Sequence, residues 1–160
     1  VIAHNPMSNL KLGSGIAPIR QMCDRGVPVG LGVDGSASND SSNLILEARQ
    51  AMLLQRVAFG ADAMSAREAL ELATRGGADI LGRPECGRLA PGKRADLAIW
   101  DVSGLESAGS WDPAALLLAG PMTVKHLFVE GQQIIRDHAF AKLDLPAVIA
   151  EQNRLARNLM

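Results

Sequence analysis

The apolar residues in the first part of the chain fall into two short continuous runs, each followed by residues at helical spacing. The run 1–3 ends at His4-Asn5-Pro6, where the proline disfavours a helical conformation of the preceding residue and so closes a strand. The run 27–33 has no polar alternation, which is typical of a strand in a parallel sheet that is covered on both faces. These runs predict two strands.

Helical spacing of apolar residues fills the chain after each strand. A first helix is expected from Ile16 to a stop at Gly26, after a loop over residues 7–15. Two longer helices are expected over residues 44–59 and 65–81, where strong helix formers have few breakers. Strand, helix, strand and helix in this order predict a parallel α/β unit, in which ligand-binding groups gather at the carboxyl ends of the strands.

The second half of the chain changes to turns and short strands. The strands expected there are 95–100, 124–129 and 133–135. The last two form a hairpin about Glu130-Gly131, and a helix is expected over residues 145–159. This pattern predicts a separate β-rich unit that is closed by a helix.

Composition and charge exclude several classes of protein. The 160 residues suffice for one domain, and 48% of them are apolar. Lys and Arg number 16 against 17 Asp and Glu, so we expect no surface for nucleic acid. No apolar run approaches the roughly 20 residues that span a bilayer, and no signal segment opens the chain, so we expect a cytoplasmic protein without a membrane partner.

The first residues of the chain suggest that the sequence is a fragment. There is no initiator methionine, and Val1-Ile2-Ala3 reads as part of a strand. We therefore expect a longer parent protein.

Asp34 ends the second predicted strand and opens a loop rich in glycine, serine and asparagine. A carboxylate at the end of a parallel strand is costly to bury unless it is paired or bound to a metal, and zinc accepts aspartate oxygen as a ligand. A metal ligand is therefore one interpretation of Asp34. On the residues alone, an Asx turn or a helix-capping aspartate is the stronger interpretation.

Four motifs occur in an order that resembles the amidohydrolase superfamily. They are HNPxSNxKLGSG over 4–15, GVDGxxSN over 32–39, ALxxATxGGA over 69–78 and GxLxPGKxADL over 87–97. Within that superfamily they resemble the branch of cytosine, guanine and triazine deaminases. The loop GVDGSASNDSSN and the helix after it are most similar to those of 8-oxoguanine deaminases, with hydroxyatrazine-type aminohydrolases close behind.

The resemblance implies an α/β fold with two parts. The first is the C-terminal portion of a metal-dependent (β/α)8 TIM-like barrel, to which residues 1–83 would supply the last two strands and their helices. The second is part of a small β-sandwich domain over residues 84–143, followed by a C-terminal helix over 144–160.

The resemblance also implies a chemistry, the hydrolytic release of ammonia from an aminated purine, pyrimidine or triazine ring. Zinc is the expected cofactor and iron the alternative. Asp34 would bind the metal, accept a proton from the attacking water and pass it to the leaving ammonia. The other metal ligands of the family, a His-x-His pair, a His-x-x-Glu motif and a further His, would precede Val1, so we expect the 160 residues alone to be inactive.

Three further residues are candidates for contact with the substrate, namely His4, Ser36 and Asn39. His4 ends the first strand, and a structural role in the protein interior is an equally good interpretation. Ser36 and Asn39 lie in the loop after Asp34, where capping of the loop is an equally good interpretation.

Structural roles are expected for most of the remaining polar residues of interest. Side chains that brace a loop through bonds to the backbone are expected at Asn5, Ser8 and Asn9. Charges near a helix N-terminus are expected at Asp40 and Glu47. Surface or packing roles are expected at His126 and His138.

Two classes of function remain open on these grounds. The first is a deaminase of a small heterocyclic substrate, which we expect to act as a homo-oligomer of the whole protein. The second is a non-catalytic module that serves in assembly or binding. Zinc bound near one equivalent in the longer protein would favour the first.

Overall fold

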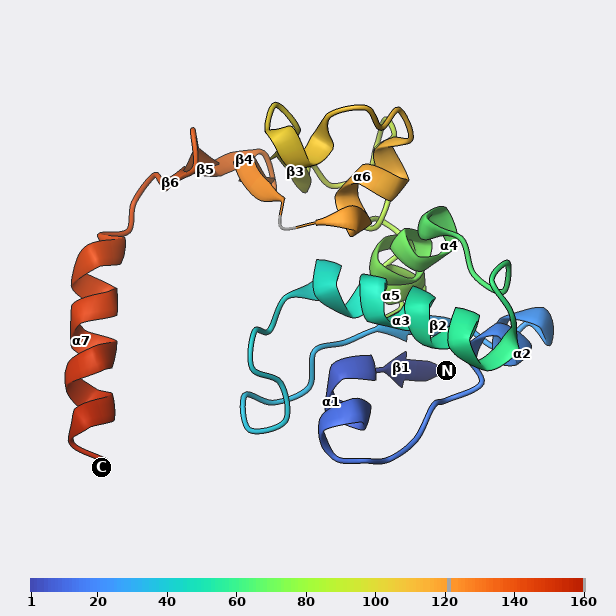
Figure 1. Ribbon diagram of the computed structural model, residues 1–160. Coiled ribbons are helices and arrows are strands. Elements are labelled where there is room, and N and C mark those ends of the chain that lie inside the picture. Colours follow the sequence, from blue (N-terminus) through green and yellow to red (C-terminus); the bar gives the residue numbers. More distant parts are fainter. Residues whose placement is uncertain (121, 160) are drawn as a thin grey trace. The chain divides into compact units, whose positions relative to one another are not determined.

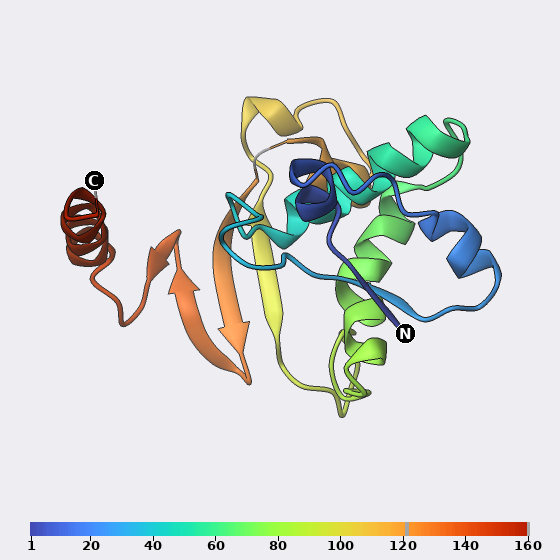
Figure 2. The ribbon, with the colours of Figure 1, turned by 90° about the horizontal axis from the view of Figure 1, so that it is seen from below.

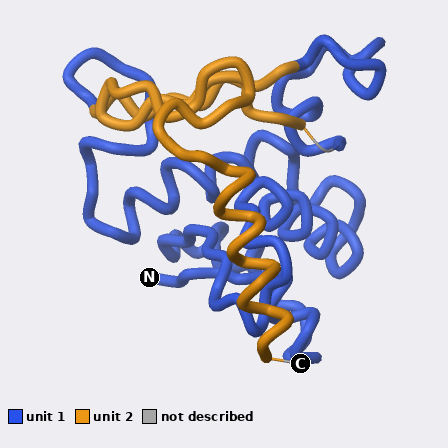
Figure 3. The backbone as a smooth tube through the Cα atoms, turned by 90° about the vertical axis from the view of Figure 1, so that its left-hand side faces the viewer, with its two compact units in different colours: residues 1–93, 102–121 blue, residues 94–101, 122–160 orange. Residues whose placement is uncertain are grey.

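The computed structural model describes residues 1–120 and 122–159, and Figure 1 shows the order of its helices and strands. The chain forms two compact units, which Figure 3 distinguishes by colour. The first contains Val1–Lys93 and Val102–Pro121, and the second contains Arg94–Asp101 and Met122–Met160. The first unit therefore includes residues 84–93, which the sequence placed in the β-rich part; the domain bounds of the whole protein stay a prediction.

Two short strands of the first unit pair in parallel, as predicted. They are β1 (Ile2–His4) and β2 (Val29–Leu31), with Ile2 opposite Val29 and His4 opposite Leu31. All three residues of β2 are buried, which agrees with the absence of polar alternation in this run. The strand is shorter than the predicted span of 27–33.

Helices account for most of the first unit. They are α1 (Pro6–Lys11), α2 (Ile19–Asp24), α3 (Leu44–Phe59), α4 (Ala66–Glu71), a π-helical turn (Leu72–Gly76), α5 (Gly77–Ile80), a 3-10 turn (Leu105–Ser107) and α6 (Pro113–Ala119). The predicted bounds of α3 are confirmed. Ser65 caps α4 by accepting from the Glu68 N–H, and the Glu68 carboxylate accepts from the Ser65 N–H, so the two residues form a capping box.

Two predictions in this unit were wrong. Residues 7–11 belong to α1 rather than to a loop, because Pro6 stands at the first helical position, where a missing N–H is no loss. The next helix begins at Ile19 rather than at Ile16, after Pro18 at its N-cap. Helix α6 was not predicted, although Asp112 caps it through the Ala114 N–H at 3.0 Å and Pro113 opens it.

The core of the first unit brings β2 and the helices together. Its buried members are Ile19, Val29, Leu31, Ala48, Ala51, Met52, Met64, Ala69 and Leu118. They come from α2, β2, α3, α4 and α6 and from the loop before α4. The burial of these side chains is the main stabilising contribution to the unit.

Glycines of the GGA motif let the π-helical turn lie directly against β2. A Cβ atom at Gly76 would overlap the carbonyl oxygen of Val29. On the strand side, a Cβ atom at Gly30 would lie 2.7 Å from the Ile80 Cδ1 and 2.9 Å from the Gly77 Cα. Gly76 of this motif and Gly30 of β2 therefore serve close packing of helix on strand.

The second unit is a four-stranded antiparallel meander followed by a helix. Its elements are β3 (Leu97–Asp101), β4 (Thr123–Val129), β5 (Gln132–Arg136), β6 (Ala139–Phe140) and α7 (Leu145–Arg157). Figure 2 shows the strands side by side in the order β3-β4-β5-β6. The predicted hairpin is confirmed, and Glu130 and Gly131 both have the positive φ that a tight two-residue turn requires. This unit contributes one sheet, so the sandwich stays a prediction.

Candidate functional site

The carboxyl ends of β1 and β2 carry the polar residues that the sequence singled out. His4 is the last residue of β1, and Asp34 follows β2 by three residues. Because the two strands are parallel, their carboxyl ends lie at the same edge of the sheet. Asp34 has a φ of 59°, a left-handed conformation that is uncommon for a residue with a side chain and is often found at functional sites.

Two serine hydroxyls hold the exposed carboxylate of Asp34. Ser8 Oγ, from α1, and Ser38 Oγ, from the loop after β2, each donate to Asp34 Oδ2 at 2.6 Å. Together with the Gly35 N–H, these bonds favour the ionised form, so they hold the pKa of Asp34 below its usual range, with Ser38 contributing most. The Ser8 side chain was expected to form a hydrogen bond with the backbone, and it donates to the Asp34 side chain instead.

The pKa of Asp34 has a chemical consequence. The carboxylate is ionised at neutral pH, and both hydroxyls donate their hydrogen bonds to Oδ2 rather than to Oδ1. Ser8 and Ser38 are neutral, so they orient the carboxylate without neutralising its charge. Asp34 can therefore accept a proton or bind a cation.

Glu47 contacts this loop and lies in the first turn of α3, near the helix N-terminus as expected. Its burial was not predicted: the side chain is fully buried. Its Oε2 accepts from the Met7 N–H at 3.0 Å, and its Oε1 accepts from the side-chain amide of Asn39. No signal within the sequence of α3 could identify these partners, which lie 40 and 8 residues away.

Asn39 is also buried, and its amide is fully oriented by its neighbours. Its Oδ1 accepts from the Ser41 N–H at 3.2 Å and from the Ser42 N–H at 3.0 Å, while its Nδ2 donates to Glu47. These bonds cap the loop, which was one of the two roles expected for Asn39. Its contact with a substrate stays a prediction.

His4 is a buried polar side chain with an unused ring nitrogen. It is only 3% exposed, and its Nε2 has no hydrogen-bond partner among the described residues. Burial disfavours the charged ring and lowers the pKa of His4 to about 4, so the imidazole is neutral at pH 7. A buried nitrogen without a partner is costly, and a ligand could supply the missing bond.

Ser36 and Asn5 complete the edge of the site. Ser36 is exposed on the loop that follows Asp34. Asn5 directly follows β1, and its Oδ1 occupies the space that a Cβ atom at Gly32 would fill. The glycine of the GVDG motif therefore makes room for the asparagine of the HNP motif.

A metal ion fits Asp34 as one ligand of several. Asp34 supplies an ionised, exposed carboxylate, which is a donor that zinc accepts. Across residues 1–120 and 122–159, no group of three His, Cys, Asp or Glu side chains could hold a metal ion. A complete metal site therefore requires ligands beyond those that the described residues bring together.

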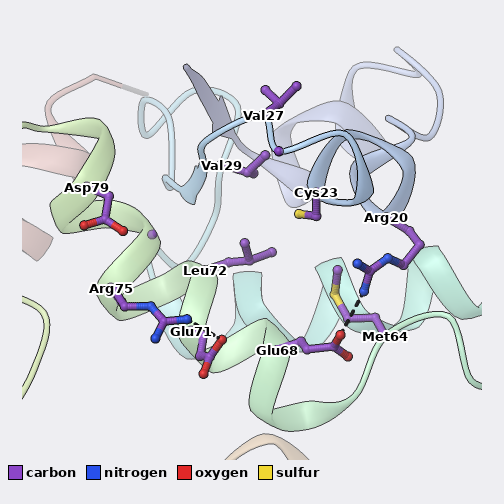
Figure 4. A pocket seen from close by; sticks show the side chains of 12 residues that line it. Arg20, Cys23, Val27, Val29, Met64, Glu68, Glu71, Leu72, Arg75 and Asp79 are labelled. Atoms are coloured by element: carbon purple, nitrogen blue, oxygen red, sulfur yellow. Dashed lines mark hydrogen bonds and ion pairs between the residues drawn. The ribbon is translucent and has the colours of Figure 1, made fainter.

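The first unit also contains a hollow of about 320 Å³ near the opposite end of β2 (Figure 4). Its lining includes Val29 and the charged residues of α2, α4 and the π-helical turn. Arg20 Nη1 lies 2.8 Å from Glu68 Oε1, and Arg75 Nη2 lies 2.9 Å from Glu71 Oε2. These four charges are paired with one another. The hollow is also lined by the exposed acid Asp79 of α5, but among the described residues no hydroxyl bonds its carboxylate as Ser8 and Ser38 bond that of Asp34.

The two histidines of the second unit lie beside carboxylates. His138 Nε2 is 3.2 Å from Asp101 Oδ2, and His126 Nε2 is 3.7 Å from Asp137 Oδ1. Each histidine has one acidic neighbour, which agrees with the surface or packing role expected for both. In the part of the chain that the structure describes, no helix has the length and apolar character needed to cross a membrane.

Comparison with known proteins supports the resemblance drawn from the motifs. Residues 1–134 match the model of the amidohydrolase family. The chain is 49% identical over 160 residues to an 8-oxoguanine deaminase of Pseudomonas aeruginosa. The aligned region covers 99% of this chain and 36% of that relative.

Two solved structures resemble this one closely. The atrazine chlorohydrolase TrzN of Arthrobacter aurescens TC1, in complex with zinc, matches with a TM-score of 0.90 and 38% sequence identity. The match covers 97% of this chain and 35% of the TrzN chain. An adenosine deaminase of Xanthomonas campestris with bound zinc matches with a TM-score of 0.92 and 31% sequence identity. The match covers 98% of this chain and 36% of the deaminase chain. The chain thus spans about a third of the length of these proteins.

Proposed function

Because the chain belongs to the amidohydrolase family, we propose that the whole protein is a metal-dependent hydrolase that deaminates an aminated purine, pyrimidine or triazine ring. The observation that carries this proposal is the ionised carboxylate of Asp34, which two neutral hydroxyls orient at the carboxyl end of a parallel strand. The 49% identity to an 8-oxoguanine deaminase makes 8-oxoguanine the first substrate to test.

The proposed fold of the whole protein follows the same relatives. Residues 1–83 supply the last two strands and their helices to a (β/α)8 barrel, residues 84–143 contribute to a β-sandwich, and residues 144–160 form the C-terminal helix. The high TM-scores against two zinc-containing enzymes support the barrel assignment. Active sites of such barrels lie at the carboxyl ends of the strands, where His4 and Asp34 lie.

Asp34 would hold the metal together with residues from the rest of the protein. Zinc is present in both solved relatives and suits a carboxylate ligand; iron is the alternative. When bound, the ion supplies Lewis-acid activation of water.

The chain's own residues supply the proton transfers. Asp34 accepts a proton from the attacking water, whose oxygen bonds to the amino-bearing ring carbon. Asp34 then gives this proton to the amino nitrogen, the carbon–nitrogen bond breaks, and ammonia leaves. The second proton of the water ends on the adjacent ring nitrogen, so the product carries a carbonyl beside a ring N–H. Ser8 and Ser38 hold the carboxylate oxygen through this exchange.

His4 and Ser36 are proposed to contact the substrate. The free Nε2 of His4 is neutral at pH 7 and can bond a polar ring edge of a heterocycle. Ser36 presents an exposed hydroxyl from the loop that follows Asp34.

The experiment that tests the proposal measures ammonia release by the whole protein, with metal content determined on the same samples. The substrates are 8-oxoguanine, guanine, cytosine and hydroxylated triazines. Turnover of at least one of them, lost on chelation and restored by zinc, is expected. Absence of bound metal together with no ammonia from any substrate would favour the non-catalytic module instead.

The hydroxyatrazine-type activity is the second candidate. The likeness to a triazine-hydrolysing enzyme at a TM-score of 0.90 favours it. A higher kcat/KM on hydroxylated triazines than on 8-oxoguanine in the same assay would favour this second candidate over the first.

A further inference from the structure

Glu47 is a buried carboxylate that the reaction does not use. It is 0% exposed, and among the described residues it takes part in no ion pair. A buried carboxylate is costly unless it is hydrogen-bonded. Both of its oxygens are bonded, one to a backbone N–H and the other to a side-chain amide.

The two partners of Glu47 lie immediately beside the two serines that hold Asp34. Met7, whose N–H bonds Oε2, precedes Ser8. Asn39, whose amide bonds Oε1, follows Ser38. One carboxylate therefore joins the two segments that present hydroxyls to the same oxygen of Asp34.

We propose that Glu47 is a positioning residue for Asp34, which sets the separation of α1 and the loop after β2 so that Ser8 and Ser38 both reach Oδ2. Its role in turnover rests on the proposed function, whereas its bonding role does not. Residues that orient a reacting group in this indirect way commonly change activity by about 10- to 100-fold when they are altered.

A second link between the same segments is exposed and serves as a control. Lys11, at the end of α1, pairs with Asp40 of the loop. Exposed ion pairs contribute little, because water competes for both charges. We therefore expect Asp40→Asn to leave turnover within about twofold of the wild type.

Glu47→Gln tests the proposal with little change of shape. Both partners of Glu47 are donors, so the new amide can accept from only one of them and presents its own N–H groups to the other. We expect kcat to fall by about 10- to 100-fold while KM stays within about threefold. A role confined to global stability would lower the melting temperature and leave the kcat of the folded fraction unchanged.

Glu47→Gln combined with Asn39→Asp provides the rescue. The new amide at position 47 can donate to the new carboxylate at position 39 and still accept from the Met7 N–H. The second oxygen of that carboxylate can accept from the Ser41 and Ser42 N–H groups, as the Asn39 Oδ1 does. Asn39→Asp alone places two carboxylates together, so we expect each single variant to be impaired. The kcat of the double variant should be at least about tenfold higher than that of Glu47→Gln.

Hydrogen exchange supplies a readout that needs no activity. In Glu47→Gln, peptides over residues 5–12 and 34–43 should exchange roughly tenfold faster than in the wild type, and the double variant should restore the slow rate. Unchanged exchange in both peptides, or no rescue by the double variant, would overturn the proposal.

The same data separate this proposal from the proposed function. If the whole protein releases no ammonia from any substrate, the function fails, and hydrogen exchange still decides whether Glu47 joins the two segments. If deamination is found and Glu47→Gln keeps the wild-type kcat and the wild-type exchange rates, the positioning role fails and the function stands.

Discussion

The two ends of β2 contain polar groups of opposite kinds. At the amino end, the hollow of about 320 Å³ is lined by two ion pairs, Arg20 with Glu68 and Arg75 with Glu71, and by the exposed acid Asp79. At the carboxyl end, Asp34 is bonded to the neutral hydroxyls of Ser8 and Ser38, and no ion pair of Asp34 is found within the described residues.

The size of a hollow is therefore a poor guide to the position of the reactive group. Paired charges are held by each other and have little left to offer a ligand. A carboxylate that is oriented by hydroxyls keeps its full negative charge and a pKa below its usual range. The chemistry is therefore expected at the carboxyl end of β2.

The largest effect is expected from removing the charge at the carboxyl end. Asp34→Asn keeps the shape of the side chain but removes the proton-accepting oxygen, so deaminase activity of the whole protein should fall by at least about 10³-fold. Asp79→Asn, which alters an exposed acid lining the hollow at the amino end, should leave activity within about twofold. Ammonia release, metal content and melting temperature are measured for both variants. Comparable losses in the two variants would contradict the contrast.

The next effect concerns packing at the amino end rather than chemistry. A Cβ atom at Gly76 would overlap the Val29 carbonyl, so Gly76→Ala should lower the free energy of unfolding by about 3 kcal/mol. At the neighbouring Gly77, the nearest atom to an added Cβ is the Leu72 carbonyl oxygen at 4.0 Å. Gly77→Ala should therefore be neutral or stabilising by about 0.5 kcal/mol. Urea unfolding measures both, and equal effects would show that the close approach to β2 is not the cause.

Local patterns predicted the elements whose cause is local. The bounds of α3 follow from a continuous run of helix formers after the Asn43 cap, and the hairpin follows from Glu130-Gly131. Helix α1 was missed although its signal, a proline at the first helical position, lies in the sequence. The same signal at Pro113 would have identified α6.

The site was predictable only in part. Asp34 and His4 could be proposed because each falls at a strand end, and the order of the motifs supported both. The partners of these groups are contacts between distant segments: Ser8 lies 26 residues from Asp34, and Met7 lies 40 residues from Glu47. Hydrophobic periodicity carries no information on such pairs, so the burial of Glu47 was not foreseen.

A smaller effect is expected from the buried histidine at the carboxyl end. Burial lowers the pKa of His4 from 6.5 to about 4, so between these values the unfolded chain binds a proton that the folded chain does not. The free energy of unfolding should therefore fall as the pH is lowered from 6.5 to about 4, by an amount on the order of 2 to 3 kcal/mol, and level off below that.

The variant His4→Gln should lack this dependence. The difference between the wild-type and variant curves of unfolding free energy against pH isolates the contribution of His4 from that of the carboxylates. A difference that stays constant across this range would mean that the imidazole is not held neutral by burial.

The smallest effect is expected from removing one hydroxyl at the carboxyl end. Ser38→Ala takes away the hydrogen bond that contributes most to the low pKa of Asp34, so this pKa should rise toward its usual value. Asp34 must be ionised to accept a proton, and the acidic limb of the kcat/KM profile should therefore move to higher pH. At neutral pH the loss of orientation should lower kcat by about 10-fold. Ser36→Ala, which removes an exposed hydroxyl two residues from Asp34, is the matched control and should leave the acidic limb in place. If Ser38→Ala and Ser36→Ala give the same profile, the hydroxyls do not hold Asp34 in its reactive state, and the carboxyl end differs from the amino end only in its lack of paired charges.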